Sequence, residues 1–163
     1  MGFSRAQLQD YQGASVPDLV GPGLRLLFVG INPGLWTAAT GTPFAHPGNR
    51  FYPALAAAGI IDGLDGFADG FGDAQRKHLI EAGIGISNLV NRATVRADEL
   101  SRAELREGAL HLTGRVRSWH PAVVAVVGIT AYRQAFDRPR AVAGLQPERI
   151  ADAELWIVPN PSG

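Results

Sequence analysis

One stretch constrains the fold most: residues 26–34, which read LLFVGINPG. An uninterrupted apolar run of this length is typical of a strand buried on both faces of a parallel sheet. The Gly, Asn, Pro and Gly at its end are turn residues. The stretch therefore predicts a strand over residues 25–29 and a tight loop at its carboxyl end, where open α/β sheets bind their ligands.

The loop after this strand contains residues suited to a binding site. Gly30 and Gly34 allow the backbone to come close to a bound group, and Pro33 stiffens the chain. Asn32 supplies a neutral amide with both a donor and an acceptor. A strand followed by a Gly- and Pro-containing turn is also the ordinary junction of an α/β protein. The residues alone leave both interpretations open.

The rest of the chain alternates between strands and helices. Further strands are expected over residues 84–90, 122–127 and 155–158, and helices over residues 50–58, 74–82, 101–119 and 131–136. Asn49 is expected to cap the first of these helices, and Ser101 with Glu104 forms a capping box for the third. The alternation predicts a single α/β domain over residues 1–163, a three-layer α/β/α fold with a central, mostly parallel sheet.

Three segments fall outside this alternation. Residues 1–21 are expected to form an N-terminal arm, either a short helix or a loose segment, that carries no chemistry. Residues 35–48 predict a long functional loop, because they follow the first strand directly. Residues 62–73 contain four glycines and two phenylalanines and are expected to form a surface insertion rather than part of the core.

Composition excludes several classes of protein. The chain has no cysteine, which excludes disulfides, thiolate zinc sites and cysteine-held iron–sulfur clusters. It has no apolar run of membrane-spanning length and no signal-peptide core, so we expect a cytoplasmic protein. The 15 basic and 15 acidic residues give a net charge of zero, so any binding of nucleic acid is expected to be local and modest.

Polar motifs cluster at one edge of the predicted sheet. The carboxyl ends of parallel strands share an edge, so Asn32, residues 92–98, Gly128 and Asn160 should border one crevice. Two further motifs accompany LLFVGINPG: residues 41–51, GTPFAHPGNRF, and residues 156–163, WIVPNPSG. Together the three stretches closely resemble the mismatch-specific uracil-DNA glycosylases, the thymine-DNA glycosylase-like family of the uracil-DNA glycosylase superfamily. The resemblance runs from about Pro22 to Gly163.

The resemblance implies a pocket for a nucleotide that is swung out of double-stranded DNA. Phe44 would stack on the extruded base, and Ile31, Gly34 and Thr37 would line the pocket. Asn32 would orient the attacking water. At position 34 the lack of a side chain leaves room for a methyl group, so the pocket is expected to accept uracil opposite guanine and other altered pyrimidines such as ethenocytosine.

The resemblance further implies hydrolysis without a metal or organic cofactor, by a monomer. Asn32 cannot take a proton as a carboxylate can, so slow turnover is expected. Asp98, or less readily Glu99, follows the second strand and is a hypothetical helper in water activation. The alternative is that either carboxylate only favours the start of the helix at Ser101. We interpret His46 as structural.

The last motif resembles a loop that enters the minor groove. Asn160, Pro161, Ser162 and Gly163 would contact DNA beside the extruded nucleotide, with the Ser162 hydroxyl suited to phosphate. In relatives this loop continues with wedge residues and another helix. The sequence ends at Gly163, so either it is truncated or the wedge is missing, and both strand preference and opposite-base selectivity stay open.

The predicted function is a DNA repair glycosylase that removes uracil from G·U mismatches and so starts base excision repair. Two alternatives stay open. One is a DNA-binding α/β domain that is catalytically weak or inactive. The other is a nucleotide- or phosphate-binding module, although the loop lacks both the P-loop lysine and the three-glycine dinucleotide fingerprint.

Overall fold

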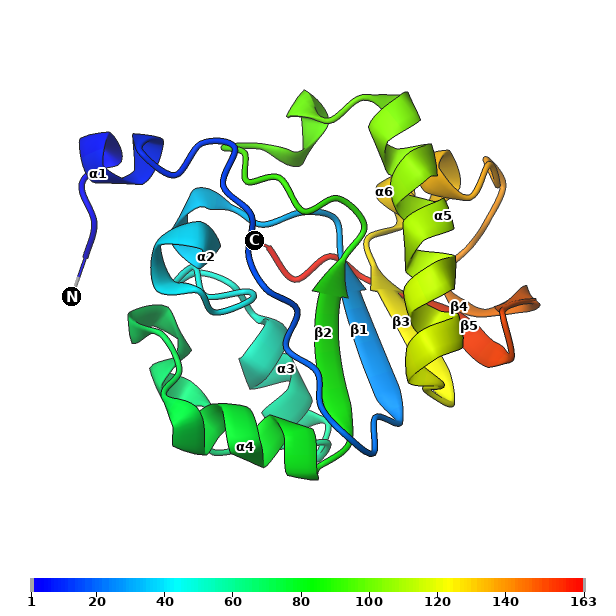
Figure 1. Cartoon of the computed structure of the whole chain (residues 1–163), viewed down its shortest axis with the longest axis horizontal. Helices are drawn as coiled ribbons and strands as arrows, with labels where there is room; N and C mark the ends of the chain where they lie inside the picture. Colours follow the sequence, from blue (N-terminus) through cyan, green and yellow to red (C-terminus); the bar gives the residue numbers. More distant parts are fainter. Residues whose placement is uncertain (1, 163) are drawn as a thin grey trace.

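A computed structural model describes residues 2–162 of the chain. Five strands form one sheet in the order β2-β1-β3-β5-β4 (Figure 1). The strands are β1 (Leu26–Gly30), β2 (Ile84–Asn88), β3 (Val123–Val127), β4 (Gly144–Ile150) and β5 (Ala153–Val158). All neighbouring pairs are parallel except β4 with β5. Helices lie on both faces of the sheet, so the predicted three-layer α/β/α fold is confirmed.

One face of the sheet is covered by α5 (Arg102–Trp119) and α6 (Ile129–Ala135). Leu112 and Val116 of α5 pack with Leu27 and Val124 of the sheet in one hydrophobic cluster. The capping box at the start of α5 is confirmed, because the Ser101 hydroxyl accepts from the backbone of residue 104 and the side chain there accepts from the Ser101 backbone. This helix contacts the carboxyl end of β2, where Arg115 donates to the Asn88 carbonyl.

The other face is covered by α3 (Phe51–Ala57), α4 (Asp73–Glu81) and the 3-10 helix η1 (Asp65–Asp69). The expectation that residues 62–73 form a surface insertion is wrong. Phe67 and Phe71 are each only 8% exposed, and their rings contact that of Tyr52 at centroid distances of 5.3 and 5.1 Å. Gly70, at φ 90°, turns the chain between the two rings, so both reach the core.

Residues 35–48 are not a continuous loop. They begin with α2 (Leu35–Thr40), which ends at Gly41 in the left-handed conformation. The helix is only six residues long and contains no charged residue, so it shows neither an amphipathic pattern nor a charge bias that would predict it.

Strand β4 is also absent from the predictions. It lies at the edge of the sheet, antiparallel to β5, with an irregular register between Leu145 and Arg149. Its sequence, GLQPERI, contains glycine, proline and charged residues, which are tolerated at an edge but weaken the strand pattern.

The N-terminal arm begins with a short helix, α1 (Arg5–Gln9), capped by Ser4. The arm then follows the protein surface. The backbone N–H of Gly13 donates to the carbonyl of Ala93, and Leu19 pairs with Ile86 of β2. No helix within residues 2–162 is long and apolar enough to cross a membrane.

Candidate active site

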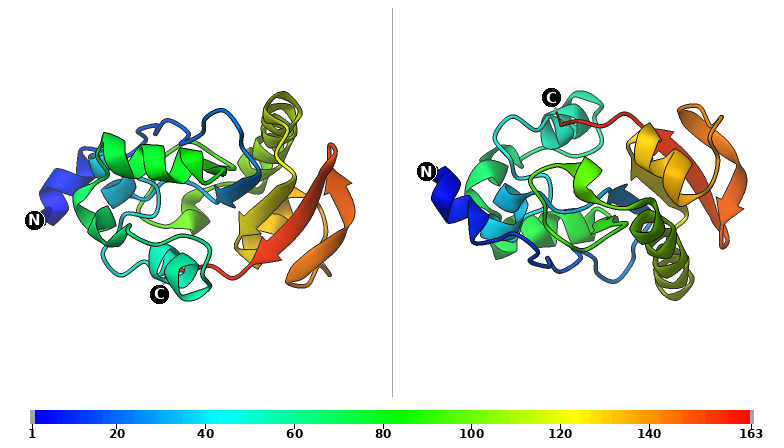
Figure 2. Two further views of the ribbon diagram at one scale, coloured as in Figure 1. Left: turned by 90° about the horizontal axis from the view of Figure 1, so that it is seen from below. Right: turned by 90° about the horizontal axis from the view of Figure 1, so that it is seen from above.

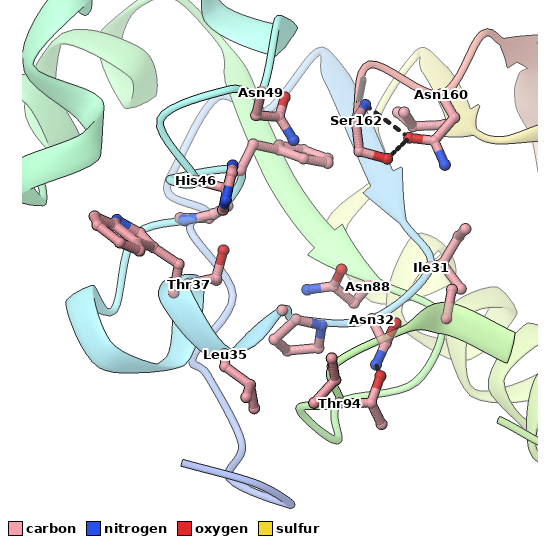
Figure 3. Close-up of a pocket in the computed structure, with 18 of the residues that line it drawn as sticks. Ile31, Asn32, Leu35, Thr37, His46, Asn49, Asn88, Thr94, Asn160 and Ser162 are labelled. Carbon is pink, nitrogen blue, oxygen red and sulfur yellow. Dashed lines mark hydrogen bonds between the residues drawn. The ribbon is translucent and has the colours of Figure 1, made fainter. Parts of the chain in front are cut away.

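A cavity of about 640 Å³ opens at the carboxyl edge of the sheet (Figure 3). Its wall comes from the loop after β1, from α2, from residues 43–49 and from the ends of β2 and β3. Thr94, Val95, Ala97, the C-terminal loop and Leu8 of α1 complete it. The expected crevice is thus confirmed for Asn32, the 92–98 segment and Asn160, while Val127 lines it in place of its neighbour Gly128.

The cavity wall is uncharged. Among the described residues that line it there is no Asp, Glu, Lys or Arg, and His46 is the one histidine. Nor do residues 2–162 contain a group of three or more His, Asp or Glu side chains placed to hold a metal ion. Three asparagine side chains, Asn32, Asn88 and Asn160, supply neutral donors and acceptors to the wall.

The Asn32 side chain is held in one orientation. Its Nδ2 donates to the backbone carbonyl of Arg92 and to Oγ1 of Thr94, both at 2.8 Å. A carbonyl oxygen only accepts, so the amide nitrogen must face it. Both N–H groups are then used, and Oδ1 remains as an acceptor on the pocket side.

Thr94 is a functional residue that the sequence did not reveal. It is 1% exposed, and its hydroxyl donates to the carbonyl of Arg96 at 2.7 Å. Because the one hydroxyl proton is used there, Thr94 Oγ1 must accept from Asn32. A threonine in the loop after β2 carries no local sign of this role, since its partner is 62 positions away.

Arg92, whose carbonyl also holds Asn32, is anchored by its own side chain. Its guanidinium donates two hydrogen bonds to the Glu104 carboxylate, from Nε at 3.0 Å and from Nη2 at 2.9 Å. These bonds, and those from Ser101, lower the pKa of Glu104 to about 2. The start of α5 and the Asn32 loop are linked through this pair.

Phe44 is positioned by contacts on two sides. Its ring stacks on Phe51 with centroids 4.1 Å apart, and its backbone has φ 54°, which costs energy for a residue with a side chain. A Cβ at Gly30 would stand 3.2 Å from the Phe44 ring and 2.7 Å from Oδ1 of Asn88. Glycine at position 30 is therefore what lets Phe44 and Asn88 approach the same point.

Asn88 is a second residue that sequence reasoning missed. It ends β2, lines the cavity, and extends its amide into it (Figure 3). Within the described part of the chain, its side-chain amide has no hydrogen-bond partner, so a donor and an acceptor are both available. The signal available in the sequence was a polar residue near the carboxyl end of a predicted strand, next to the predicted crevice.

The C-terminal loop places a third amide in the wall. Oδ1 of Asn160 accepts from the Ser162 backbone N–H at 3.0 Å and from its hydroxyl at 2.7 Å (Figure 3). The Nδ2 group is then free to donate, and it lies 4.0 Å from where a Cβ at Gly128 would be. Gly163 lies outside the described residues.

The same loop is joined to the start of α3. The backbone N–H of Arg50 donates to the Pro161 carbonyl at 3.1 Å, and Asn49 pairs with Ser162 as an isolated bridge. Figure 2 shows the C-terminal segment reaching α3 in both views. The expectation that Asn49 caps this helix is wrong, because α3 begins one residue later than predicted and its N-cap is Arg50; Oδ1 of Asn49 instead accepts from the Phe51 N–H at 2.9 Å, from one residue before the cap.

The remaining predicted residues divide into two groups. Ile31, Gly34, Thr37 and His46 all line the cavity. Around Gly34 a Cβ would meet nothing within 4 Å, so position 34 faces open space. His46 Nδ1 accepts from the Gly48 N–H at 3.1 Å, a bond that holds the loop and agrees with the structural interpretation of this residue.

Asp98 and Glu99 are not brought into the cavity. The Asp98 side chain is 71% exposed and pairs with Arg96 at 3.2 Å, and the Glu99 carboxylate accepts from the Arg96 backbone N–H. Ala97 lines the cavity in their place. The short 3-10 helix η2 (Ala97–Glu99) turns both carboxylates outward, so the expectation that one of them reaches the crevice is corrected.

Fold and site together define an α/β protein with an amide-lined pocket at the carboxyl edge of a mostly parallel sheet. The family model of the Uracil DNA glycosylase superfamily matches residues 17–163, and the chain belongs to this superfamily. Membership supports a DNA glycosylase that removes uracil, a hydrolase of N-glycosyl bonds acting on DNA in base excision repair.

Proposed function

We propose that this protein is a monofunctional, mismatch-specific uracil-DNA glycosylase of the thymine-DNA glycosylase-like family, acting as a monomer on double-stranded DNA. One observation carries the proposal. Two side-chain amides in the wall of one cavity are held in opposite orientations. Asn32 has its N–H groups engaged and offers its oxygen as an acceptor, whereas Asn160 has its oxygen engaged and offers its N–H groups as donors.

Hydrolysis of the glycosidic bond needs both kinds of group. Water attacks C1′ of the deoxyribose, the bond from C1′ to N1 of uracil breaks, and the base departs with the bonding electrons. Oδ1 of Asn32 accepts a hydrogen bond from the water and so orients its lone pair toward C1′. The water proton passes to solvent or to the departing base, because no carboxylate lines the cavity.

The departing base needs stabilisation of its negative charge. Donors already aimed at developing charge lower the barrier without rearrangement in the transition state. The free Nδ2 group of Asn160 supplies such donors. Asn88, whose amide is unengaged within residues 2–162, suits the neighbouring N3–H and O4 of uracil, which need an acceptor and a donor side by side.

Phe44 and Gly34 determine, in this proposal, which bases the pocket accepts. The Phe44 ring, which stacks on the ring of Phe51, would also stack on the extruded base. Gly34 leaves space that a pyrimidine with an added group could use. A methyl group changes binding by only about 1–3 kcal/mol, so ethenocytosine is expected to be removed and thymine to be removed slowly.

The C-terminal loop is the proposed DNA contact. Asn160, Pro161 and Ser162 are preorganised by the turn within the loop and by its pairing with the start of α3. The Ser162 hydroxyl and nearby backbone groups would bind phosphates beside the extruded nucleotide, with Gly163 next in the chain.

The test uses an end-labelled duplex that holds a single G·U pair, with A·U and G·C duplexes as comparisons. After incubation, alkali cleaves the strand wherever a base has been lost. Scission at the G·U site that is greater than at A·U and disappears in Asn32→Ala supports the proposal. Binding without scission would support a catalytically inactive DNA-binding domain, and equal scission at both sites would remove mismatch specificity.

A further inference from the structure

Asn88 lies at an unusual place in the sheet. β2 is an edge strand, and the N-terminal arm pairs with it only through the isolated bridge of Leu19 with Ile86. The outward carbonyl of Asn88 therefore has no strand beside it. It accepts instead from Nη2 of Arg115, on α5, at 2.7 Å.

This use of an arginine is energetically costly. Arg115 is partly buried, and its Nε is buried without a partner among the described residues. Burial lowers the pKa of the guanidinium, and the nearby charge of Asp18 opposes the shift. A buried N–H with no acceptor destabilises the fold, and an apolar side chain of similar size is often as good or better at such a position.

The packing of α5 does not depend on Arg115. Leu105, Leu112 and Val116 of this helix are at most 4% exposed within a large hydrophobic cluster. Gly108 lets the helix approach the loop after β2 so closely that a Cβ there would lie 2.4 Å from the carbonyl of Leu89. The helix is thus held by its apolar face and by this close contact.

Asn88 borders two cavities. It lines the substrate cavity on one side and a second cavity of about 280 Å³ on the other, which Asp18, His111 and Arg115 also border. Its side chain has no partner within residues 2–162 to hold it in place. Within those residues, the bond from Arg115 therefore restrains Asn88 through its backbone and not through its amide.

We propose that Arg115 is a positioning residue: through its bond to the Asn88 carbonyl it holds the Asn88 amide in the substrate cavity, at the edge of the extruded base. The inference rests on the proposed function. Small displacements of groups that position a substrate have large effects on rate. Arg115 would thus hold the Asn88 amide in place at a cost in folding stability.

The test compares Arg115→Met with Arg117→Met, an exposed arginine on the same helix. Single-turnover uracil release and the thermal unfolding temperature are measured for both. We expect Arg115→Met to release uracil on the order of tenfold to a hundredfold more slowly, with an unchanged or raised unfolding temperature. Arg117→Met should match the wild type in both. Wild-type rate in Arg115→Met, or a loss of rate that follows a fall in unfolding temperature, would overturn the proposal.

A double-mutant cycle tests whether Arg115 acts through Asn88. In Asn88→Ala, adding Arg115→Met should have little further effect on the rate. A further loss of the same size as in the wild-type background would contradict the proposal.

A third readout does not need catalysis. The side-chain amide resonances of Asn88 should shift or broaden in Arg115→Met and stay unchanged in Arg117→Met. If the wild type releases no uracil, the proposed function fails, and this resonance still decides the inference about Arg115: an unchanged Asn88 signal in Arg115→Met would overturn it.

Discussion

The loops that follow β1 and β5 use the same residue type for opposite purposes. Asn32 and Asn160 each stand two residues after the end of a parallel strand. In the first loop both N–H groups of the amide are engaged, and its oxygen is left. In the second the oxygen accepts two hydrogen bonds, and the N–H groups are left. The comparison shows that the partners of an asparagine, and not its identity, decide which chemistry it can perform.

The loops also differ in what fixes them. The partners of Asn32 lie 60 and 62 positions away and are held by the packed loop after β2. The partner of Asn160 is two residues away in an exposed turn. Changes around Asn32 should therefore affect both stability and rate, whereas changes around Asn160 should affect rate alone.

The largest expected effect comes from Asn32→Ala. Without the acceptor that orients water, uracil release should slow by a factor on the order of 10²–10⁴. Binding of a G·U duplex should persist, because the cavity and the C-terminal loop are unchanged. Single-turnover release and a gel-shift assay measure the two quantities. A rate within a few fold of wild type would show that Oδ1 of Asn32 does not orient the attacking water.

Asn160→Asp should have the next largest effect. The carboxylate keeps the acceptor for Ser162, so the turn survives, but the N–H donors are replaced by negative charge beside the departing base. Release should slow by a factor on the order of 10²–10³, more than in Asn160→Ala, while the unfolding temperature stays near wild type. Equal rates in the two variants would indicate that Asn160 does not face the leaving group.

Thr94→Val tests whether the Asn32 loop depends on distant packed partners more than the Asn160 loop does. It leaves an N–H of Asn32 and the carbonyl of Arg96 without partners in a buried region, and we expect a stability loss of about 1–3 kcal/mol together with slower release. Ser162→Ala is the matched hydroxyl deletion in the exposed loop, and its stability should change by less than about 0.5 kcal/mol. Urea unfolding measures the free energy of unfolding of both variants. Equal losses of stability would contradict the claim that the Asn32 loop is held by packed partners and the Asn160 loop is not.

The Arg92 and Glu104 pair gives the Asn32 loop a pH dependence that the Asn160 loop lacks. In the folded protein the pKa of Glu104 is about 2, below its ordinary value of 4.5. Stability from the pair is therefore present above pH 4.5 and is lost as the pH falls toward 2. Glu104→Gln keeps an oxygen for the Ser101 N–H but loses the charge. Its unfolding temperature should be lower than wild type at pH 7, and the two should converge between pH 4.5 and 2. A difference in unfolding temperature that stays the same from pH 7 to pH 2 would contradict the dependence of stability on the ionised Glu104 carboxylate.

The smallest effect is expected for Asp98→Asn. Its carboxylate is exposed and paired with Arg96, so a role in water activation would require η2 to rearrange. Uracil release should stay within about twofold of wild type, since exposed ion pairs contribute little. A tenfold loss would restore Asp98 to the mechanism as the group that assists Asn32.

The sequence predicted the parts of the site that adjoin recognisable motifs. Asn32 and Asn160 follow from the rule that parallel strands end at one edge, and the place of Phe44 in the pocket was implied by the resemblance that the three short stretches carry. Thr94 was missed because its role depends on a partner 62 positions away. Asn88 was missed because a single polar residue at the end of a strand has no motif around it.

The same limit applies to the fold. The buried strands and the capped helix α5 were predicted from apolar runs and a capping box. The aromatic residues at 67 and 71 were placed on the surface because glycines surround them, and only tertiary contacts with Tyr52 bring them inside.

The central claim is that Asn32 presents an acceptor, and Asn160 donors, to one extruded nucleotide. A crystal structure with a duplex holding 2′-fluoro-2′-deoxyuridine opposite guanine tests it most directly, because the fluorine slows cleavage of the glycosidic bond. We predict a water within about 2.6–3.2 Å of Oδ1 of Asn32 beneath C1′, with Nδ2 of Asn160 facing the base. A uracil outside the cavity, or Nδ2 of Asn32 turned toward the sugar, would contradict the account.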